Sequence, residues 1–268
     1  MKEFQNRVAV ITGAGSGFGR EFARIGAARG MKLALADIEA KALGAVADEL
    51  RAQGAEIHTE RLDVSDGAAM ERFADSVFDR FGAAHLVFNN AGVGSGGLIW
   101  ENSVADWEWV LINTASVAGL LSAQTMGVYN VSKHGVVTLS ETLFQDLRIA
   151  GSKLGVTVLC PAFVDTGIKD AGRNRPEALR NTAPPTASQI AAEAQSRKAV
   201  TSGRITAAEV AAKTFGAIEA NQFYCLTHQR IMGAVQQRLE DIVQGQNPRD
   251  PFAAKQEVAF TSVLESKS

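Results

Sequence analysis

Residues 7–19 read RVAVITGAGSGFG, and this stretch decides the fold. Its first part, Val8 to Ile11, is a short apolar run rich in β-branched residues, which predicts a buried parallel strand. The glycines that follow predict a tight turn, and residues 20–28 predict a helix. A strand, a glycine turn and a helix in this order point backbone N–H groups at one place, so the stretch favours a phosphate-binding site. A glycine-rich turn without a ligand is the alternative interpretation.

An acidic residue ends the next predicted strand. Residues 32–36 are mostly apolar, and Asp37 follows them about twenty residues after the glycines. A carboxylate at this position can accept hydrogen bonds from both hydroxyls of an adenosine ribose, and it would repel a 2′-phosphate. Asp37 therefore favours NAD over NADP as the cofactor. The alternative is a strand-end aspartate that caps the following helix.

Tyr129 and Lys133 are four residues apart, which places them on one face of a helix. An ammonium group beside a phenol favours the phenolate, so we expect Lys133 to lower the pKa of Tyr129. Such a phenol can exchange a proton with an alcohol or carbonyl oxygen. Ser116 follows a strand-like run at residues 112–115 and could hydrogen-bond the same oxygen. Taken alone, the pair is weak evidence for a catalytic site, because most tyrosine–lysine pairs of this spacing are exposed side chains without a catalytic role.

The remaining sequence continues the alternation of strands and helices. Further strands are expected at residues 57–64, 85–88, 112–116, 155–160 and 223–227, with helices between them. This alternation predicts an α/β fold, a single doubly wound Rossmann domain that spans residues 1–268. Residues 163–204 are long and irregular for a compact domain, which is typical of a substrate lid, and residues 245–268 are expected to form a C-terminal tail.

The composition excludes several classes of protein. The net charge of −2 and the lack of a lysine- and arginine-rich block leave no electrostatic case for nucleic acid binding. The sequence has no apolar signal core and no run of about 20 apolar residues, so we expect a cytoplasmic protein without a membrane span. Cys160 and Cys225 lie in apolar, strand-like runs and are expected to be buried, reduced thiols. No Cys/His cluster has metal-ligand spacing, so no metal site is predicted.

Five motifs together resemble the classical short-chain dehydrogenase/reductase family. They are T-G-x-x-x-G-x-G at residues 12–19, Asp63-Val64, Asn89-Asn90-Ala91-Gly92, Ser116, and the pair Tyr129 and Lys133. The resemblance implies a seven-stranded parallel sheet, an NAD(P) cofactor, and hydride transfer at a secondary alcohol or ketone. It also implies catalysis by Ser116, Tyr129 and Lys133. The expected cofactor-binding residues are Gly13, Ser16, Gly17, Phe18, Gly19, Asp37, Ile38, Asp63, Val64, Asn90, Ala91, Gly92, Tyr129, Lys133, Val164 and Thr166.

Residues 160–166 are similar to the Pro-Gly motif of the family, whose Val and Thr reach the nicotinamide. In this chain those two residues are Val164 and Thr166. Ala162 stands where the family has glycine, so the backbone contact at this point is expected to differ.

The chain departs from the family between Leu111 and Ile112. In the family, a tryptophan-containing helix leads to a catalytic Asn and a long helix before the serine strand, whereas here Leu111 runs directly into Ile112. A covering helix of about 20 residues and part of a strand are therefore expected to be missing. Asn113 is not expected to replace the lost Asn, because strand periodicity places it on the opposite face from Ser116. Either the protein lacks this segment or the sequence omits it.

The missing helix has two expected consequences. One face of the sheet would lose its cover and leave large apolar side chains exposed. The family also uses this helix, together with the tyrosine-bearing one, to form its dimer. A homodimer or homotetramer is therefore expected unless the missing helix prevents it.

These observations predict an NAD-dependent oxidoreductase that interconverts a secondary alcohol and a ketone. The rival hypothesis is a catalytically impaired NAD-binding or scaffold protein, because the catalytic Asn and its helix are missing. A third interpretation, a sugar-nucleotide epimerase of the extended family, fits less well because the chain has no substantial C-terminal substrate domain. Trp100, Phe163 and the lid indicate a mostly apolar pocket for a small-molecule substrate.

Overall fold

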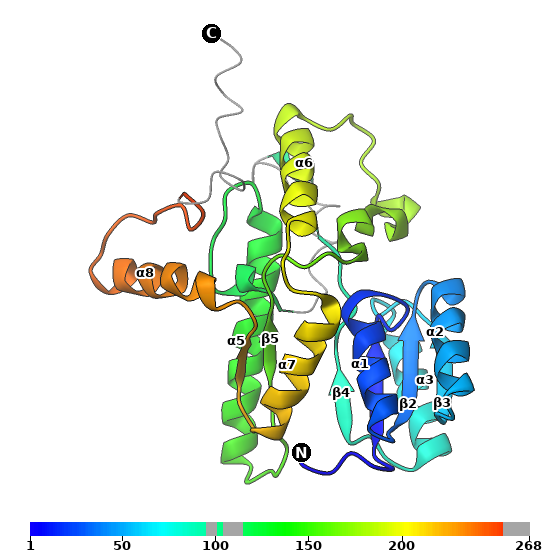
Figure 1. The fold of residues 1–268 in the computed structure, drawn as a ribbon. Helices are drawn as coiled ribbons and strands as arrows, with labels where there is room; N and C mark the ends of the chain where they lie inside the picture. The colour runs from blue at the N-terminus through cyan, green and yellow to red at the C-terminus, as the bar shows by residue number, and fades with distance from the viewer. Residues whose placement is uncertain (95–100, 104–114, 254–268) are drawn as a thin grey trace.

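Four parallel strands form the main sheet of the computed structural model, which describes residues 1–94, 101–103 and 115–253. The strands are β1 (Val8–Thr12), β2 (Lys32–Asp37), β3 (Ile57–Arg61) and β4 (Leu86–Phe88), in the spatial order β3-β2-β1-β4. They are connected by α1 (Gly17–Ala28), α2 (Ala40–Ala52) and α3 (Gly67–Phe81), which Figure 1 shows packed around the sheet. This order, with a helix in each crossover, is that of a doubly wound α/β fold, so the expected fold class is confirmed.

Alternate residues of the strands supply the two layers of the core. Ala9 and Ile11 of β1 lie in the cluster formed with α1 and α2. Val8 lies on the other face, where it clusters with Ala34 of β2 and Phe73 of α3. Because side chains along a strand alternate between faces, the near-continuous apolar runs of β1 and β2 allow both faces to be covered.

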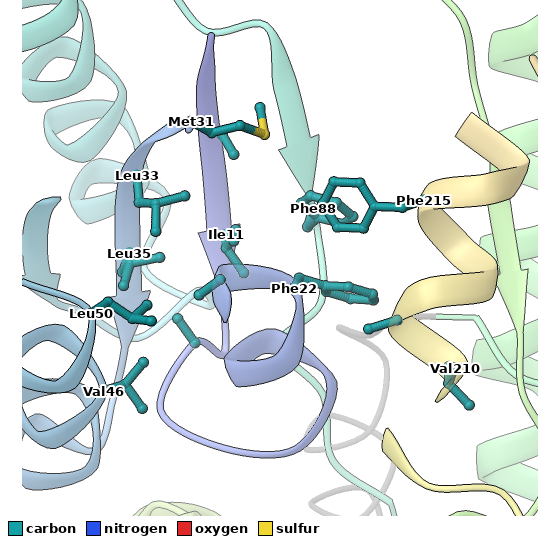
Figure 2. Packing of buried hydrophobic residues seen from close by; sticks show 14 of the residues in the cluster. Ile11, Phe22, Met31, Leu33, Leu35, Val46, Leu50, Phe88, Val210 and Phe215 are labelled. Atoms are coloured by element: carbon teal, nitrogen blue, oxygen red, sulfur yellow. The ribbon is translucent and has the colours of Figure 1, made fainter. Parts of the chain in front are cut away.

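Aromatic rings join the sheet to α1 and to α7 (Ala207–Glu219), as Figure 2 shows. Phe22 of α1 stacks on Phe88 of β4 with the ring centroids 4.4 Å apart. Phe215 of α7 lies 5.6 Å from Phe88 on the same measure. Burying a side chain of this size stabilises the fold by roughly 1.5–3 kcal/mol. This packing fixes the start of α1 relative to the ends of β1 and β4.

Helices α3 and α7 have ends that their local sequence explains. At the start of α3, Asp66 accepts a hydrogen bond from the backbone N–H of Ala69, and the helix ends at Gly82, whose φ is 73°. Helix α7 begins with a capping box formed by Thr206 and Glu209. The two helix starts follow from the local sequence because these side chains satisfy N–H groups that have no partner within the helix, and glycine suits the positive φ at the end of α3.

The second half of the chain adds a long helix and two further strands. Helix α5 (Gly127–Ile149) carries Tyr129 and Lys133, and β5 (Val158–Cys160) pairs in parallel with β6 (Tyr224–Leu226). Cys160 and Cys225 are buried and free, as expected. No helix in the described part of the chain is long and apolar enough to cross a membrane. The other elements are the 3-10 helices η2 (Val117–Gly119), η3 (Gly167–Asn174), η4 (Glu177–Leu179) and η5 (Gln229–Ile231), and the α-helices α6 (Ala187–Thr201) and α8 (Met232–Val243).

The described strands form one sheet of four and one sheet of two, whereas a single sheet of seven was expected. The strand expected at residues 112–116 begins outside the described residues, and its last residue, Ser116, caps η2 instead. In a doubly wound sheet the fifth strand lies between the fourth and the sixth. A strand at that place would join β4 to β5, and residues 1–94, 101–103 and 115–253 supply none. The sheet is therefore described in two pieces.

Large apolar side chains are exposed on β4 and α5. Leu139 and Leu143 of α5 are 70% and 47% exposed, although they recur at the helical spacing that is typical of an inward-facing stripe. Val87 of β4 is 54% exposed, which is unusual for a parallel strand. The helical pattern located the apolar face correctly, but the described residues do not cover it. This agrees with the expectation that a covering helix is missing.

The expected lid and tail both contain packed structure. The lid, residues 163–204, contains η3, η4 and α6. The described part of the expected tail is not free, because the Arg249 guanidinium donates to the buried carboxylate of Asp241 at 3.1 Å. Phe252 is 8% exposed, and its ring lies 5.6 Å from that of Phe163. Arg249 and Phe252 thus anchor this otherwise exposed segment to α8 and to Phe163.

Candidate active site

Hydrogen bonds around Thr12 join the ends of β1 and β4. The Thr12 hydroxyl donates to the carbonyl oxygen of Phe88 at 3.3 Å. It accepts from the backbone N–H groups of Asn90 and Ala91 at 3.0 and 3.2 Å. The Asn90 amide donates to the carbonyl oxygens of Thr12 and Gly13 at 2.9 and 3.3 Å. The turn after β1 is thereby held at the carboxyl edge of the sheet, where ligands bind in open α/β folds.

The glycine turn requires residues without side chains. Gly13 and Gly17 have φ values of 64° and 53°, which residues with a β-carbon rarely adopt. A Cβ on Gly19 would lie 2.1 Å from the carbonyl oxygen of Gly13. Ser16, at the start of α1, makes no hydrogen bond that caps the helix through its side chain. The first N–H groups of α1 therefore suit an anion such as a diphosphate.

Asp37 lies between the glycine turn and the start of α2. Its Oδ2 accepts a hydrogen bond from the N–H of Gly15 at 2.8 Å, and its Oδ1 accepts from the N–H of Glu39 at 2.9 Å. A carboxylate has about four acceptor positions, so both oxygens can still accept hydroxyl groups. The contact of Asp37 with an adenosine ribose stays a prediction. The side chain faces the crevice, and it also bonds the backbone at the start of α2.

Asp63 and Val64 follow β3 and line the same crevice. The Asp63 carboxylate accepts hydrogen bonds from the backbone N–H and the hydroxyl of Ser65, at 2.9 and 2.8 Å. Its side chain therefore organises the turn before α3. The expected contact of these residues with an adenine stays a prediction.

Tyr129 and Lys133 lie together on α5, as their spacing predicted. The Lys133 ammonium nitrogen is 4.8 Å from the centroid of the Tyr129 ring. The Ser116 hydroxyl lies close enough to the Tyr129 phenol to lower its pKa. The Ser116 hydroxyl also donates to the carbonyl oxygen of Pro161 at 3.3 Å and accepts from the N–H of Ala118 at 3.2 Å. The three predicted catalytic residues therefore meet at one point, where η2 faces the first turns of α5.

Burial controls the charge of these groups. Lys133 is only 2% exposed, and this burial lowers its pKa from 10.5 to about 7. Burial raises the pKa of Tyr129, and the Ser116 hydroxyl acts in the opposite direction. The pKa of Tyr129 is therefore raised overall, because desolvation of the phenolate outweighs the effect of Ser116. At neutral pH Tyr129 is a protonated phenol, which is the form of a proton donor.

Almost all the predicted residues share one cavity of about 730 Å³. This volume lies within the range of roughly 300–1,000 Å³ that is usual for small-molecule sites. Gly19 is the exception, because it is buried beneath the glycine turn. No group of three or more His, Cys, Asp or Glu residues in the described part of the chain could hold a metal ion. The predicted residues that line the cavity are Gly13, Ser16, Gly17, Phe18, Asp37, Ile38, Asp63, Val64, Asn90, Ala91, Gly92, Ser116, Tyr129, Lys133, Val164 and Thr166.

The two ends of the cavity differ in their lining. The close approach of the glycine backbone to Ala91 leaves no room for a β-carbon at Gly13, which is typical of a diphosphate cradle. The other end is lined by apolar residues, among them Leu121, Phe163 and Phe252. Phe163 was expected there, whereas Trp100 lies outside the described residues.

Sequence reasoning missed Glu39, Arg173 and Phe252, which all line the cavity. The Arg173 Nε donates to a carboxylate oxygen of Glu39 at 3.0 Å across 134 positions of sequence. Opposite charges so far apart give no signal in a single sequence. The one available hint of Phe252 was that this apolar residue directly follows the polar segment 244–251.

The family model for the short chain dehydrogenase matches residues 7–111 and 110–177. The two matched pieces meet at residues 110–111, beside the junction at which the sequence predicts a missing segment. One curated relative is the CLA biosynthesis dehydrogenase/reductase of Lactiplantibacillus plantarum. It is 30% identical over 273 residues, with 91% of this chain and 95% of the relative covered. Since 91% of 268 residues is about 244, some 29 aligned positions have no counterpart in this chain.

Solved structures agree with this match. A short-chain dehydrogenase/reductase from Burkholderia phymatum, solved in complex with NAD, is 53% identical and has a TM-score of 0.91. The match covers 94% of this chain and 99% of that one. Levodione reductase is 27% identical with a TM-score of 0.66, over 83% of this chain and 95% of that one. The chain therefore belongs to the short-chain dehydrogenase family of oxidoreductases.

Proposed function

We propose that the protein is an NAD-dependent oxidoreductase that interconverts a secondary alcohol and a ketone. One observation carries the proposal: the glycine turn and the group Ser116, Tyr129 and Lys133 face the same cavity. The glycine turn suits a diphosphate, and the second group suits proton exchange at an oxygen atom. The dehydrogenase and reductase names of the relatives support the same reaction class.

NAD is the proposed cofactor, rather than NADP. Asp37 and Glu39 place two carboxylates at the start of α2, where they would repel a 2′-phosphate. The solved relative from Burkholderia phymatum was found with NAD. In the proposed assignment, Gly13 and Gly17 admit the diphosphate, Asp37 holds the adenosine ribose, and Val164 and Thr166 lie toward the nicotinamide end.

When bound, the nicotinamide would supply the hydride acceptor or donor. Tyr129, a protonated phenol at neutral pH, donates its proton to the carbonyl oxygen during ketone reduction. The reverse reaction needs the phenolate as a base, so alcohol oxidation should rise with pH. Ser116 holds the substrate oxygen beside the phenol. Lys133 stabilises the developing phenolate when its amine is protonated.

The proposed substrate is a small, mostly apolar molecule. Val117 and Leu121 pack with Phe252 in one apolar cluster, and Phe163 packs against it. A hydrocarbon or aromatic group is the natural partner of such a wall. The reacting oxygen would lie at the polar end, beside Ser116 and Tyr129.

We also propose that the chain is one domain, residues 1–268, which works in the cytoplasm as a homodimer or homotetramer. Val131, Leu139 and Leu143 of α5 are 49%, 70% and 47% exposed, and association would cover this apolar face. Size-exclusion chromatography with light scattering tests the assembly. A monomer at every concentration would contradict it.

The function itself is tested in two steps. Titration of the purified chain with NADH, followed by protein-to-nicotinamide energy transfer, should give saturable binding, with weaker binding of NADPH. A panel of secondary alcohols and ketones should then show NAD(H)-dependent turnover that is lost in Tyr129→Phe. Saturable NADH binding without turnover on any substrate would favour the rival function, a catalytically impaired NAD-binding or scaffold protein. The break in the family match at residues 110–111 is the observation that supports this rival.

A further inference from the structure

Arg173 and Asn174, at the end of η3 in the lid, both bind Glu39. The Arg173 guanidinium donates from Nε and Nη2 to Glu39 Oε1, with Nε at 3.0 Å. The Asn174 amide donates to the same oxygen at 3.0 Å. We call this group of three residues the latch. It joins segments that are 134 and 135 positions apart in sequence.

Arg173 is held in place from its other side as well. Its Nη1 donates to the carbonyl oxygens of Gly167 and Asp170, both at 2.9 Å. The guanidinium therefore ties the backbone of η3 to Glu39, and the lid cannot move as a unit while these bonds hold. Isolated surface ion pairs contribute little, but several charge-assisted bonds to one planar guanidinium fix its geometry.

The latch adjoins the proposed cofactor site. The Glu39 backbone N–H donates to Asp37, the proposed ribose-binding residue, at 2.9 Å. The other end of the same lid segment lies on the glycine turn, because a Cβ on Gly17 would be 3.3 Å from the Cβ of Thr166. The segment 166–174 thus crosses the crevice from the glycine turn to the start of α2. Figure 1 shows the short helices of the lid (yellow-green) above α1 and α2.

The charges of the latch persist over the ordinary pH range. The hydrogen bonds from Arg173 and Asn174 lower the pKa of Glu39, with Arg173 as the larger cause. Glu39 is therefore ionised at neutral pH. Salt, rather than a proton, is the variable that weakens such a pair.

We propose that Arg173, Asn174 and Glu39 form a latch that closes the lid over the dinucleotide and sets the rate at which it is released. This inference rests on the proposed NAD binding. The path out of the crevice on the side of the glycine turn and Asp37 passes beneath residues 166–174. The dinucleotide leaves when the latch opens, so Arg173 and Glu39 are positioning residues that act through the lid.

The test is a stopped-flow measurement of NADH release, with excess NAD⁺ as the displacing ligand. Arg173→Gln and Glu39→Gln should each speed release about three- to tenfold, as expected for a partly exposed charged pair. The double variant should be no faster than Glu39→Gln, because that substitution alone already breaks the Arg173–Glu39 ion pair and weakens the bond from Asn174. The charge-swapped double variant Arg173→Glu/Glu39→Arg should restore slow release. About 0.5 M NaCl should speed release in the wild type and leave Arg173→Gln unchanged.

Arg180→Gln is the matched control. Arg180 belongs to the same lid, and its guanidinium pairs with Glu177 at 3.2 Å without reaching α2. This variant should release NADH at the wild-type rate. An unchanged rate of NADH release in Arg173→Gln, or additive effects of Arg173→Gln and Glu39→Gln, would overturn the proposal that the latch controls release. A wild type that shows no saturable NADH binding would instead overturn the proposed function, so the two failures are distinguishable.

Discussion

The sheet half of the molecule, residues 1–94, and the tyrosine helix α5 cover their apolar residues to very different degrees. Ile11 and Leu33 of the sheet are fully buried, whereas Leu139 of α5 is 70% exposed. Strands β1, β2 and β3 are each followed directly by a helix in the sequence, so local βα units cover most of this half, and Val87 of β4 is the exception at 54% exposed. Helix α5 depends on cover that residues 1–94, 101–103 and 115–253 do not provide. Cofactor binding and catalysis should therefore respond separately to mutation.

The largest expected effect is that of Tyr129→Phe, which should impair catalysis at α5 and leave cofactor binding by the sheet half almost intact. Tyr129→Phe should lower turnover about 10²–10⁴-fold, because the phenol oxygen is the proton donor. NADH affinity should change much less, since the glycine turn lies in the other half. Steady-state kinetics and NADH titration of the same preparation measure both quantities. A loss of NADH affinity as large as the loss of turnover would contradict the separation of cofactor binding from catalysis.

Tyr224→Phe is the control for this variant. Tyr224 is the second of the two tyrosines in the chain, and its hydroxyl donates to Glu141 at 2.5 Å, away from the cavity. Its loss should leave turnover at the wild-type level.

Lys133→Met should stabilise the unliganded fold at neutral pH. The folded-state pKa of Lys133 is about 7, against 10.5 for an unperturbed lysine. Between these values the unfolded chain binds more protons, so this group makes stability rise with pH and its cost is largest below pH 7. Removing it should add on the order of 3–4 kcal/mol at pH 7 and about 1 kcal/mol at pH 9.5. Urea unfolding at both pH values measures the gain, and an equal change at the two would contradict the burial of a chargeable amine.

Gly19→Ala should lower both the stability of the sheet half and its affinity for the cofactor. The new Cβ would lie 2.1 Å from the carbonyl oxygen of Gly13, so the turn must shift. We expect a loss of about 1–3 kcal/mol of stability and weaker NADH binding. Gly44→Ala in α2 is the control, because no atom lies within 4 Å of its added Cβ. There a gain of about 0.5–1 kcal/mol is expected from helix propensity. Thermal unfolding that ranked the two variants the other way would be inconsistent with the turn geometry.

The smallest expected effect is that of Leu139→Ala in α5. With 70% of the side chain exposed, the change in unfolding free energy should stay within about 0.5 kcal/mol. The same substitution at Leu50, which is fully buried, should cost about 2–5 kcal/mol. Denaturant unfolding at low protein concentration compares the two. A large cost at Leu139 would mean that this face is covered, and it should then depend on protein concentration.

The sequence was sufficient for features that depend on neighbouring residues. The strand, glycine turn and helix at residues 8–28, the cap of α3 at Asp66 and the capping box at Thr206 all follow from short-range patterns. Helical spacing likewise located the apolar face of α5. What lies against that face depends on a segment far away in the chain, so the exposure of Leu139 was not foreseen.

Properties of the site that depend on tertiary contacts were also missed. The contact between Glu39 and Arg173 bridges 134 positions, and no local pattern encodes it. The raised pKa of Tyr129 comes from the depth of its burial, which a spacing of four residues does not specify. Sequence patterns therefore identified which groups meet, whereas the structure supplied their charge states.

The two thiols in the strand pair β5–β6 have a practical consequence. Leu159 pairs with Cys225 in the parallel register, and Cys160 follows one position later. Burial raises the pKa of the Cys160 thiol to about 12, and it raises that of Cys225 as well. Because the thiolate is the reactive form, alkylating reagents should not modify either side chain in the native protein. The rate at which alkylating reagents label the two thiols should therefore report how often the strand pair β5–β6 opens.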